Sequence, residues 1–384
     1  MFDFPLGPTV PLAPPLYPSS VYNIPDLDAL DRISDGTDPG FIYARDGHPN
    51  AKLLADQLAT LEGGAWAVVC GSGMGAITAA FLAFVSAGDR IVASNRLYGR
   101  TSKFMNQQIS RFGVRTDIVD CNDLDAVRAA LATPAKVLYV ETISNPLCRS
   151  VDLPALADLA HAAGTKLVVD NTFATPVLCR PLEHGADLVM ESLTKLIGGH
   201  SDLTLGSLAG RGGDLFPRLT DLISTWGLFA NPFDCWMCTR GLATLDLRVT
   251  AAADNALAVA SWLADQPGVT RVVYPGRPDQ PDHDLTGRLL GGRFGNMLCF
   301  ELAGGRAAVN AFVRAAPAIP LSPSLGHVTT TLSYPWATSH RYDSPEAKTR
   351  QGITEGLIRL SVGIEPAERI RAEMARGLAA ATLR

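Results

Sequence analysis

The sequence predicts a two-domain α/β protein with a mostly parallel central sheet and a smaller C-terminal α/β domain. Short apolar strand patterns alternate with helical periodicity from about residue 51 to residue 195, which is typical of a parallel sheet with helices on both faces. Near Arg240 this alternation stops, and a long helical stretch leads into a second strand–helix unit. A chain of 384 residues is also longer than one small core usually accommodates.

The bulk composition indicates a globular protein and excludes several other classes. Hydrophobic residues make up 47% and charged residues 18% of the chain, as in ordinary folded interiors rather than in disordered proteins. A net charge of −5 is not the basic footprint of a nucleic-acid-binding protein. No apolar run is long enough to span a membrane, and the proline-broken N-terminus has no basic region of the kind that opens a signal peptide.

The cysteines suggest a reducing compartment. There are seven of them, an odd number, and they are scattered, which favours free thiols in a cytoplasmic protein. Cys235 and Cys238 form one C-x-x-C pair, but no second pair or cluster of histidines follows it. Packing inside a helix therefore explains this pair better than zinc binding or redox chemistry.

The chain divides into three regions. Residues 1–47 are rich in proline, glycine and aromatic side chains, and we expect an extended arm that lies against another surface. Tyr43 and Arg45 in this arm face the same way if it is extended, although a solvated loop explains the pair equally well. Residues 48–240 form the main domain, and residues 241–384 form the C-terminal domain.

Periodicity places the individual elements of both domains. Composition predicts that the proline-rich segment 277–284 is a surface loop. In the main domain we predict helices at 51–61, 101–112, 123–132 and 153–163, and strands at 65–70, 90–95, 115–119, 136–142, 166–172 and 187–191. After a helical stretch from about 233 to 264, we predict a strand at 295–302, a helix at 307–316 and a strand at 357–365.

A glycine-rich turn follows the first predicted strand. The segment GSGMGAI runs directly into an apolar helical pattern, a geometry that aims backbone N–H groups and the positive end of a helix dipole at an anion, most often a phosphate. Gly71, Gly73 and Ala76 also satisfy the G-x-G-x-x-A form of the dinucleotide fingerprint. That alternative requires an acidic residue after the second strand, which instead ends in Ser94 and Asn95.

Three polar residues lie at or just beyond the ends of predicted parallel strands. Asn145, Asp170 and Lys195 are expected to meet at one rim of the sheet, where ligands of such folds bind. A lysine flanked by hydroxyls just past a buried strand suits Schiff-base chemistry, because burial lowers its pKa. Taken alone, Lys195 is better explained as a surface lysine, and Asp170 is equally well explained as a turn or helix-cap residue.

Arg359 lies inside the last predicted strand. A buried arginine is costly without an anionic partner. Its side chain therefore either faces solvent or holds a carboxylate through a two-pronged hydrogen bond.

Taken together, these segments resemble the pyridoxal-phosphate enzymes of cysteine and methionine trans-sulfuration. That family includes cystathionine γ-synthase, cystathionine γ- and β-lyase, methionine γ-lyase and the homoserine-ester sulfhydrylases. The resemblance implies the aspartate-aminotransferase-like fold type I of PLP-dependent transferases, PLP as cofactor, and a dimer of dimers with active sites shared across subunits. The motifs that carry it are FIYARDGHPN, GSGMGAI, ETISNP, VVDNTFATP, SLTKLIGGHSD and GLIRLSVGIE.

The resemblance implies a role for each candidate residue. Lys195 is similar to the lysine that holds the cofactor and moves protons, and Asp170 to the partner of the pyridine nitrogen. Tyr98 is similar to the ring that stacks on the pyridine and protonates a leaving group. The phosphate ligands it implies are Gly73, Met74, Ser192 and Thr194, with Tyr43 and Arg45 from a neighbouring subunit. The substrate carboxylate ligands it implies are Arg359, Asn145 and Ser324.

Two positions depart from the family pattern. Arg100 stands where relatives usually carry glycine or cysteine, and His327 where many carry a small or acidic residue. We expect γ-elimination by a carbon–sulfur lyase acting on cystathionine-, homocysteine- or methionine-type amino acids. The alternatives are a γ-replacement synthase, a dinucleotide-dependent oxidoreductase and a homologue without activity. The selectivity of Arg100 and His327, and of the site for leaving group and thiol acceptor, stays open.

Overall fold

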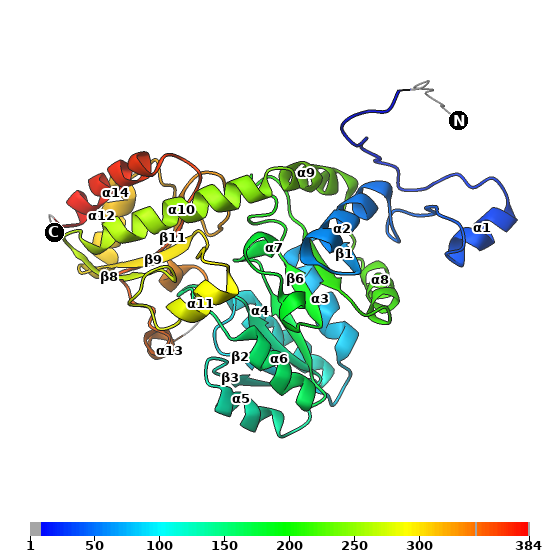
Figure 1. Ribbon diagram of the computed structural model, residues 1–384, viewed down its shortest axis with the longest axis horizontal. Helices are drawn as coiled ribbons and strands as arrows, with labels where there is room; N and C mark the ends of the chain where they lie inside the picture. Colours follow the sequence, from blue (N-terminus) through cyan, green and yellow to red (C-terminus); the bar gives the residue numbers. More distant parts are fainter. Residues whose placement is uncertain (1–8, 342–343, 383–384) are drawn as a thin grey trace.

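A seven-stranded sheet forms the centre of the protein (Figure 1), and its strand order is β1-β7-β6-β5-β4-β2-β3. The computed structural model describes residues 9–341 and 344–382. All strands run parallel except β7, which is antiparallel to both of its neighbours. The strands are β1 (Trp66–Cys70), β2 (Arg90–Ser94), β3 (Arg115–Val119), β4 (Val137–Glu141), β5 (Lys166–Asp170), β6 (Leu188–Glu191) and β7 (Gly206–Gly210).

β7 is missing from the sequence prediction because its residues are small rather than apolar. The strand reads GSLAG, and both of its terminal glycines make close approaches. A Cβ atom on Gly206 would lie 2.4 Å from the Ser72 carbonyl oxygen, and one on Gly210 would lie 2.5 Å from the Trp66 ring. Packing therefore excludes side chains that favour strands.

Helices cover both faces of the large sheet, which is why its central strands are almost continuously apolar. Successive residues of one strand enter different cores: Leu138 packs on one face and Tyr139 on the other. The helices of this region are α2 (Pro49–Glu62), α3 (Gly73–Phe84), α4 (Gly99–Lys103), η1 (Phe104–Gln108), η2 (Ile109–Phe112), α5 (Leu124–Leu131), α6 (Leu153–Ala162), α7 (Thr175–Leu178), η3 (Pro181–His184), α8 (Leu215–Thr225) and α9 (Pro232–Leu242).

Two predicted helices are divided in the structure. The helix predicted at 101–112 changes its hydrogen-bond spacing from α4 through η1 to η2. The stretch predicted at 233–264 is broken between α9 and α10 (Leu245–Ala264). A Cβ atom on Gly241, near this break, would lie 2.7 Å from the Gly198 carbonyl oxygen. This close contact requires glycine, although glycine has a poor helix propensity.

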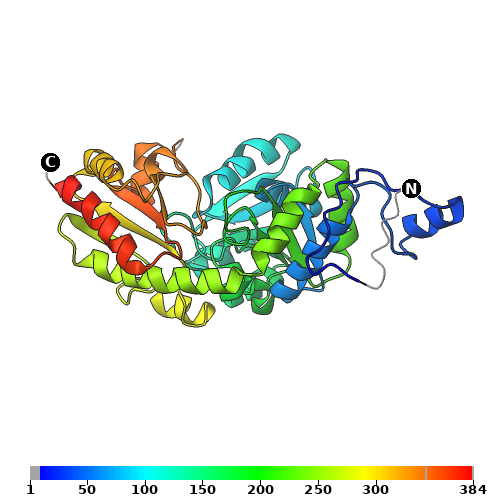
Figure 2. The same ribbon diagram turned by 90° about the horizontal axis from the view of Figure 1, so that it is seen from above.

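The N-terminal arm extends away from the body of the chain (Figures 1 and 2). Near Tyr17 the main chain is bound to the body by the Asn50 side chain, which accepts from the Tyr17 N–H and donates to the Pro15 carbonyl, each at 2.9 Å. Beyond this point the arm contains α1 (Leu27–Ser34), which was not predicted from the sequence. The Asp26 side chain caps this helix by accepting from the Ala29 N–H at 2.7 Å.

The C-terminal region is built on a four-stranded antiparallel sheet of order β10-β11-β9-β8. This confirms the smaller C-terminal domain as a unit, although β8 and β10 were not predicted. Its strands are β8 (Val269–Val273), β9 (Met297–Leu302), β10 (Thr331–Ser333) and β11 (Leu357–Ser361). Its other elements are α11 (His283–Leu289), α12 (Gly305–Ala315), η4 (Pro335–Ala337), α13 (Pro345–Arg350) and α14 (Ala367–Thr382).

The long helix α10 joins the two regions and lies along both (Figure 2). Leu245 and Val249 near its start pack into the core beneath the large sheet, whereas its later residues pack against the small sheet. Arg248 donates to the Leu196, Ile197 and Gly241 carbonyl oxygens, the last two at 3.0 and 2.7 Å. A boundary at residues 240 and 241 stays a prediction, because α10 belongs to both cores.

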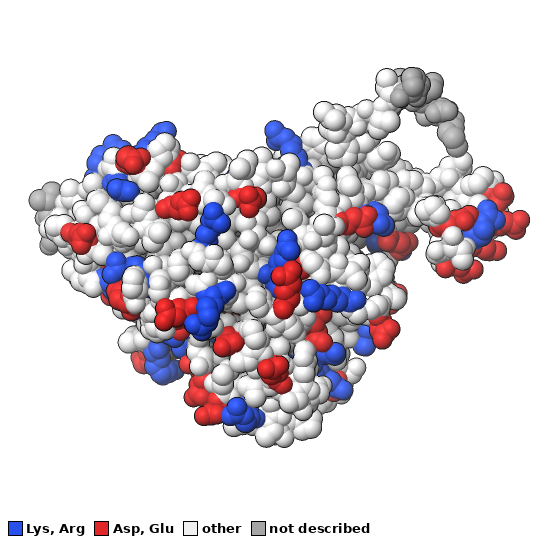
Figure 3. Space-filling model, viewed as in Figure 1, with Lys and Arg blue, Asp and Glu red and all other residues white. Residues whose placement is uncertain are grey.

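The surface charges and the cysteines have the character that the composition indicates. Acidic and basic side chains are interspersed on the face shown in Figure 3. All seven cysteines are free and buried, and Cys235 and Cys238 pack inside α9 as predicted. Among the described residues, no helix combines the length and apolar character needed to cross a bilayer.

Candidate functional site

A pocket of about 910 Å³ opens at the carboxyl ends of the parallel strands, and residues of both regions line it. Its floor is formed by the loops that follow β1, β2, β4, β5 and β6. Residues of the C-terminal region form the wall opposite this floor. The structure thus brings together residues as far apart in the sequence as Ser72 and Arg359. The predicted residues that line the pocket are Gly73, Met74, Tyr98, Asn145, Asp170, Ser192, Thr194, Lys195, Ser324 and Arg359.

Lys195 presents its amine inside this pocket rather than on the surface. The side chain follows β6, and its Nζ donates to the Ser324 hydroxyl at 3.0 Å. Burial lowers the pKa of the Lys195 amine, and the nearby Arg359 charge lowers it further. A larger share of this lysine is therefore neutral and nucleophilic near neutral pH than is usual.

The start of α3 forms a small anion cradle. Ser72 caps the helix, its Oγ accepting from the Gly75 N–H at 2.9 Å, while Gly73 and Met74 occupy the first turn, where N–H groups lack partners within the helix. A Cβ on Gly73 would lie 2.8 Å from the Ser192 hydroxyl oxygen. A glycine is thus needed to bring the helix start and this hydroxyl together. The arrangement fits a phosphate group.

Thr194 also lines the pocket, but its hydroxyl is already engaged. It donates to the Leu205 carbonyl and accepts from the Leu205 N–H, each at 3.1 Å. Its proton is thus directed at the main chain between β6 and β7, which orders the turn that carries Lys195.

Asp170 is a buried carboxylate at the end of β5, with 8% of its surface exposed. It accepts from the Thr172 N–H at 3.0 Å and lies 3.4 Å from the Tyr139 hydroxyl, and both of these donors are neutral. Burial raises the pKa of its carboxyl group. A cation beside it, such as a protonated ring nitrogen, would stabilise its charged form. The residue thus fits a cationic heterocycle.

Arg359 is buried at 5% exposure, so the solvent-facing alternative is wrong. Its Nη1 donates to the Asn145 side-chain oxygen at 2.7 Å, and its Nη2 donates to the Ser324 carbonyl at 3.0 Å. Its Nε is buried without a hydrogen-bond partner among the described residues. Burial lowers the pKa of this guanidinium. A buried cation held by neutral acceptors is suited to a carboxylate ligand.

Glu141 is a pocket residue that was not predicted from the sequence. It ends β4, is 5% exposed, and accepts from the Tyr98 and Asn145 N–H groups. It therefore fixes the loops that present both of those residues. Burial raises the pKa of Glu141, and the neighbouring Asp170 charge raises it further. The strand-end position that indicated Asp170 could have indicated Glu141 as well.

Tyr43 and Arg45 do not reach this pocket in their own chain. They are exposed on the arm, with the Arg45 guanidinium 5.1 Å from the centre of the Tyr43 ring. Arg100 lines the pocket from α4. His327 lies outside the pocket lining, where its Nδ1 is 3.2 Å from the Ser201 hydroxyl oxygen.

A second pair of acidic residues lies on the far side of the same strand ends. Glu191 lies between Met190 and Ser192 in the sequence, but unlike these two residues it does not line the pocket. It accepts a hydrogen bond from the Asn171 side chain at 3.0 Å. Glu62 is buried beside it at 1% exposure. Burial raises the pKa of Glu62 to about 8. Burial, followed by the charge of Glu62, raises the pKa of Glu191 well above its usual range.

This pair predicts how stability depends on pH. The folded-state pKa of Glu62 lies above its ordinary value of 4.5, so folding binds a proton and stability falls as the pH rises from about 4.5 through about 8. A neutral glutamine avoids this loss. We therefore expect the difference in unfolding free energy between Glu62→Gln and the unmodified protein to shift in favour of the variant by about 3 kcal/mol when the pH is raised from about 5.5 to about 9. Urea unfolding at the two pH values measures this difference.

Glu368→Gln is the control for this prediction, because Glu368 is an exposed glutamate in the first turn of α14. Its effect on unfolding free energy should hardly change between the two pH values. A pH-independent difference between Glu62→Gln and the unmodified protein would contradict the raised pKa of Glu62.

Comparisons with known proteins agree with this geometry. A family model described as Cys/Met metabolism PLP-dependent enzyme matches residues 8–379. The chain is 40% identical to an O-succinylhomoserine sulfhydrylase of Pseudomonas aeruginosa, over 92% of this chain and 87% of that one. It is 37% identical to an L-methionine gamma-lyase of Porphyromonas gingivalis, over 96% and 92%.

Solved structures give the same result. A cystathionine gamma synthase from Xanthomonas oryzae pv. oryzae, in complex with aminoacrylate and cysteine, superposes with a TM-score of 0.92 at 37% identity, covering 97% of this chain and 94% of that one. A cystathionine gamma-lyase from Lactobacillus plantarum, complexed with L-serine, superposes with a TM-score of 0.90 at 34% identity, covering 96% and 93%. The dinucleotide interpretation of the glycine-rich turn is superseded by these matches.

Proposed function

The chain belongs to the Cys/Met metabolism family of PLP-dependent enzymes, and we propose that it breaks a bond at the γ-carbon of a cystathionine-, homocysteine- or methionine-type amino acid by γ-elimination. One observation carries this proposal. The Lys195 amine is 3.0 Å from the Ser324 hydroxyl, and the Ser324 carbonyl in turn accepts from Arg359. A base of lowered pKa thus lies next to a group that can hold the substrate's α-carboxylate.

The cradle and the buried acid are the proposed cofactor ligands. Gly73 and Met74 would donate main-chain N–H groups and Ser192 its hydroxyl to the phosphate of PLP, while Asp170 would pair with the ring nitrogen. Thr194 would support this site through its bonds to Leu205. When bound, PLP supplies an electron sink for a carbanion at the substrate's α-carbon.

The remaining steps are proton transfers and binding contacts by side chains of this chain. Arg359 and Asn145 would hold the α-carboxylate near the Lys195 amine, because Ser324 contacts both Arg359 and Lys195. The Lys195 amine would remove the α-proton, give it up to the bound cofactor and then, as a free base again, remove a β-proton. It is suited to both removals because its pKa is lowered. Tyr98 at the pocket wall donates a proton to the departing γ-sulfur, and water later releases the 2-oxo acid and ammonia.

The arm is proposed to complete the site of a second subunit. Tyr43 and Arg45 are exposed on a segment that projects from the body, and the arm also exposes Val10, Leu12 and Leu27 at 87%, 106% and 76%. Apolar side chains exposed to this extent favour burial against another surface. We therefore propose a dimer of dimers in which Tyr43 and Arg45 contact the neighbouring subunit's phosphate. Free, buried cysteines favour a cytoplasmic location.

The reaction is tested by incubating the PLP-loaded protein with L-cystathionine alone and identifying the 2-oxo acid by mass. We expect 2-oxobutanoate, which reports cleavage on the γ side. Pyruvate would place the broken bond on the β side and contradict the proposal.

A second candidate is γ-replacement on an acylated homoserine, and one observation favours it. Arg100 and Lys103 both line the pocket from α4, and two cations suit a leaving group with a free carboxylate. If cystathionine alone gives no 2-oxo acid, O-succinyl-L-homoserine with L-cysteine or sulfide should give a thioether or thiol amino acid. Product from both substrates together, and from neither alone, would establish this candidate instead.

A further inference from the structure

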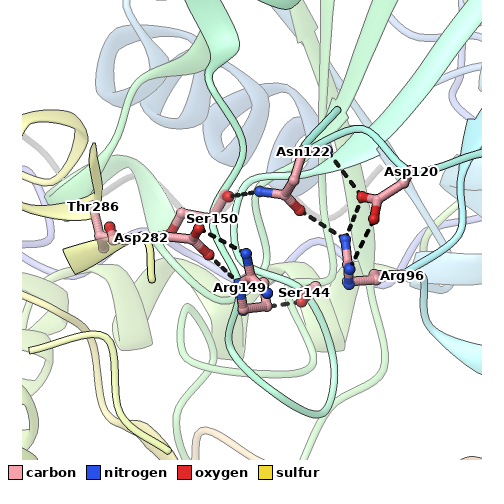
Figure 4. A network of polar contacts seen from close by, with 8 residues as sticks. All are labelled: Arg96, Asp120, Asn122, Ser144, Arg149, Ser150, Asp282 and Thr286. Carbon is pink, nitrogen blue, oxygen red and sulfur yellow. Dashed lines mark hydrogen bonds and ion pairs between the residues drawn. The ribbon is translucent and has the colours of Figure 1, made fainter. Parts of the chain in front are cut away.

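The loop between β4 and α6, residues 142–152, connects the proposed carboxylate site with α11. Toward the pocket, its Asn145 accepts from Arg359 on β11 at 2.7 Å. At its outer end, Arg149 and Ser150 contact α11 (Figure 4). The loop follows β4 of the large sheet, whereas Arg359 and α11 both belong to the C-terminal region. The same short loop therefore meets that region at two separate points.

The outer contact is a two-pronged ion pair with a buried hydrogen bond beside it. The Arg149 guanidinium donates to both carboxylate oxygens of Asp282, through Nε and, at 2.8 Å, through Nη2. Their side chains are 28% and 14% exposed, so water screens the pair only partly. The hydroxyl oxygens of Thr286 and Ser150 lie 2.9 Å apart, and both residues are fully buried.

Asp282 directs its carboxylate at the loop rather than at its own helix. It directly precedes α11, where an aspartate ordinarily caps the first turn, yet it makes no capping hydrogen bond there. Hydrogen bonding to Asp282 raises the pKa of Arg149. The helix thus gives up a local cap, and the carboxylate serves the contact with the loop.

The loop is also held from behind and stiffened within. Asn122 donates to the Ser150 carbonyl at 2.6 Å and is itself held by Arg96 at 2.8 Å (Figure 4). Inside the loop, the Ser144 N–H donates to the Arg149 carbonyl at 2.8 Å, and the Arg149 N–H donates to the Ser144 hydroxyl at 3.0 Å. Ser144 directly precedes Asn145. A displacement of Arg149 is therefore passed on to the residue that contacts Arg359.

We infer that the Arg149–Asp282 ion pair, together with the Thr286–Ser150 contact, positions Asn145 against Arg359 and thereby sets the affinity of the site for the α-carboxylate of its substrate. This inference rests on the proposed role of Arg359. Arg149, Asp282 and Thr286 are positioning residues, because they act on the substrate through Asn145.

The test separates the carboxylate contact from the rest of the site with two probes. L-Norleucine has an α-carboxylate and no γ leaving group, and pentylamine is the same molecule without the carboxylate. Both are titrated against the PLP-loaded protein by following the cofactor's absorbance. We expect Asp282→Asn and Arg149→Gln to weaken L-norleucine binding about tenfold and to leave pentylamine binding nearly unchanged.

Asp117→Asn is the matched control. Asp117 pairs with Arg90 at 2.6 Å between β3 and β2, and this ion pair has no contact with the loop. It should leave both affinities unchanged. The charge-exchanged double variant Arg149→Asp/Asp282→Arg should recover part of the L-norleucine affinity.

Equal weakening of both probes, or no change in either, would overturn the inference. If Arg149→Gln fails to fold, Thr286→Val still tests it, because valine keeps the shape of the side chain and removes the hydroxyl. That variant should weaken L-norleucine selectively, and an unchanged ratio of the two affinities would again overturn the inference. Because binding is measured without turnover, the result does not depend on whether γ-elimination or γ-replacement is the reaction.

Discussion

Replacing Lys195 with alanine is expected to reduce 2-oxo acid release from L-cystathionine by at least about a thousandfold. The substitution removes both the covalent attachment point and the base, and positioned acid–base catalysis alone contributes a factor of about 10² to 10⁴. Circular dichroism and thermal melting should show an intact fold, since Lys195 makes one side-chain hydrogen bond, to Ser324. The bound cofactor should lose the absorbance of its lysine-linked form.

Lys52→Ala is the control for this prediction. Lys52 is exposed and pairs with Asp56 one helical turn away, so its removal should leave turnover unchanged. Substantial turnover by Lys195→Ala, with an unaltered cofactor spectrum, would show that another group carries the chemistry.

Arg359→Lys is expected to lower kcat/KM by roughly 100- to 1,000-fold, because truncating one partner of a buried, charged hydrogen-bonded pair costs about 2–5 kcal/mol. The lysine keeps a positive charge but loses the planar fork that donates to Asn145 and Ser324. The loss should lie mainly in KM for amino acids with a free α-carboxylate. Steady-state kinetics separates the two constants.

Arg271→Lys provides the comparison. Arg271 lies on β8 of the same small sheet and pairs with Glu301 at 3.0 Å, outside the pocket lining. Its substitution should leave KM unaltered. A fall in kcat at constant KM for Arg359→Lys would instead indicate that Arg359 acts on the bond-breaking step rather than on carboxylate binding.

Local signals in the sequence predict much of the floor of the site, although Glu141 was missed. Apolar strands end at polar residues, and parallel strands place those ends at one edge, so the strand pattern alone assigns Asp170 and Lys195 to a common rim. The glycine-rich turn similarly indicates an anion cradle, because it runs directly into an apolar helix and so aims the N–H groups of the helix start at an anion.

Features that depend on distant contacts could not be predicted in this way. Segment 277–284 has the composition of a surface loop, and nothing in it signals that Asp282 pairs with Arg149, 133 residues earlier. β7 is made of small residues because other segments of the same chain approach it closely. It therefore lacks the apolar pattern of a strand. α1 is short and polar, and its cap at Asp26 lies within a proline-rich region that indicates an extended arm.

The helix α10 has a consequence for how the protein unfolds. Its first turns complete the core under the large sheet, and Ala256, Val259, Ala260 and Leu263 complete the core over the small sheet. Loss of either core would expose half of this helix and remove support from the half that remains. We therefore expect the two sheets to be thermodynamically coupled through this single element, so that the region that carries Arg359 and the region that carries Lys195 melt as one cooperative unit.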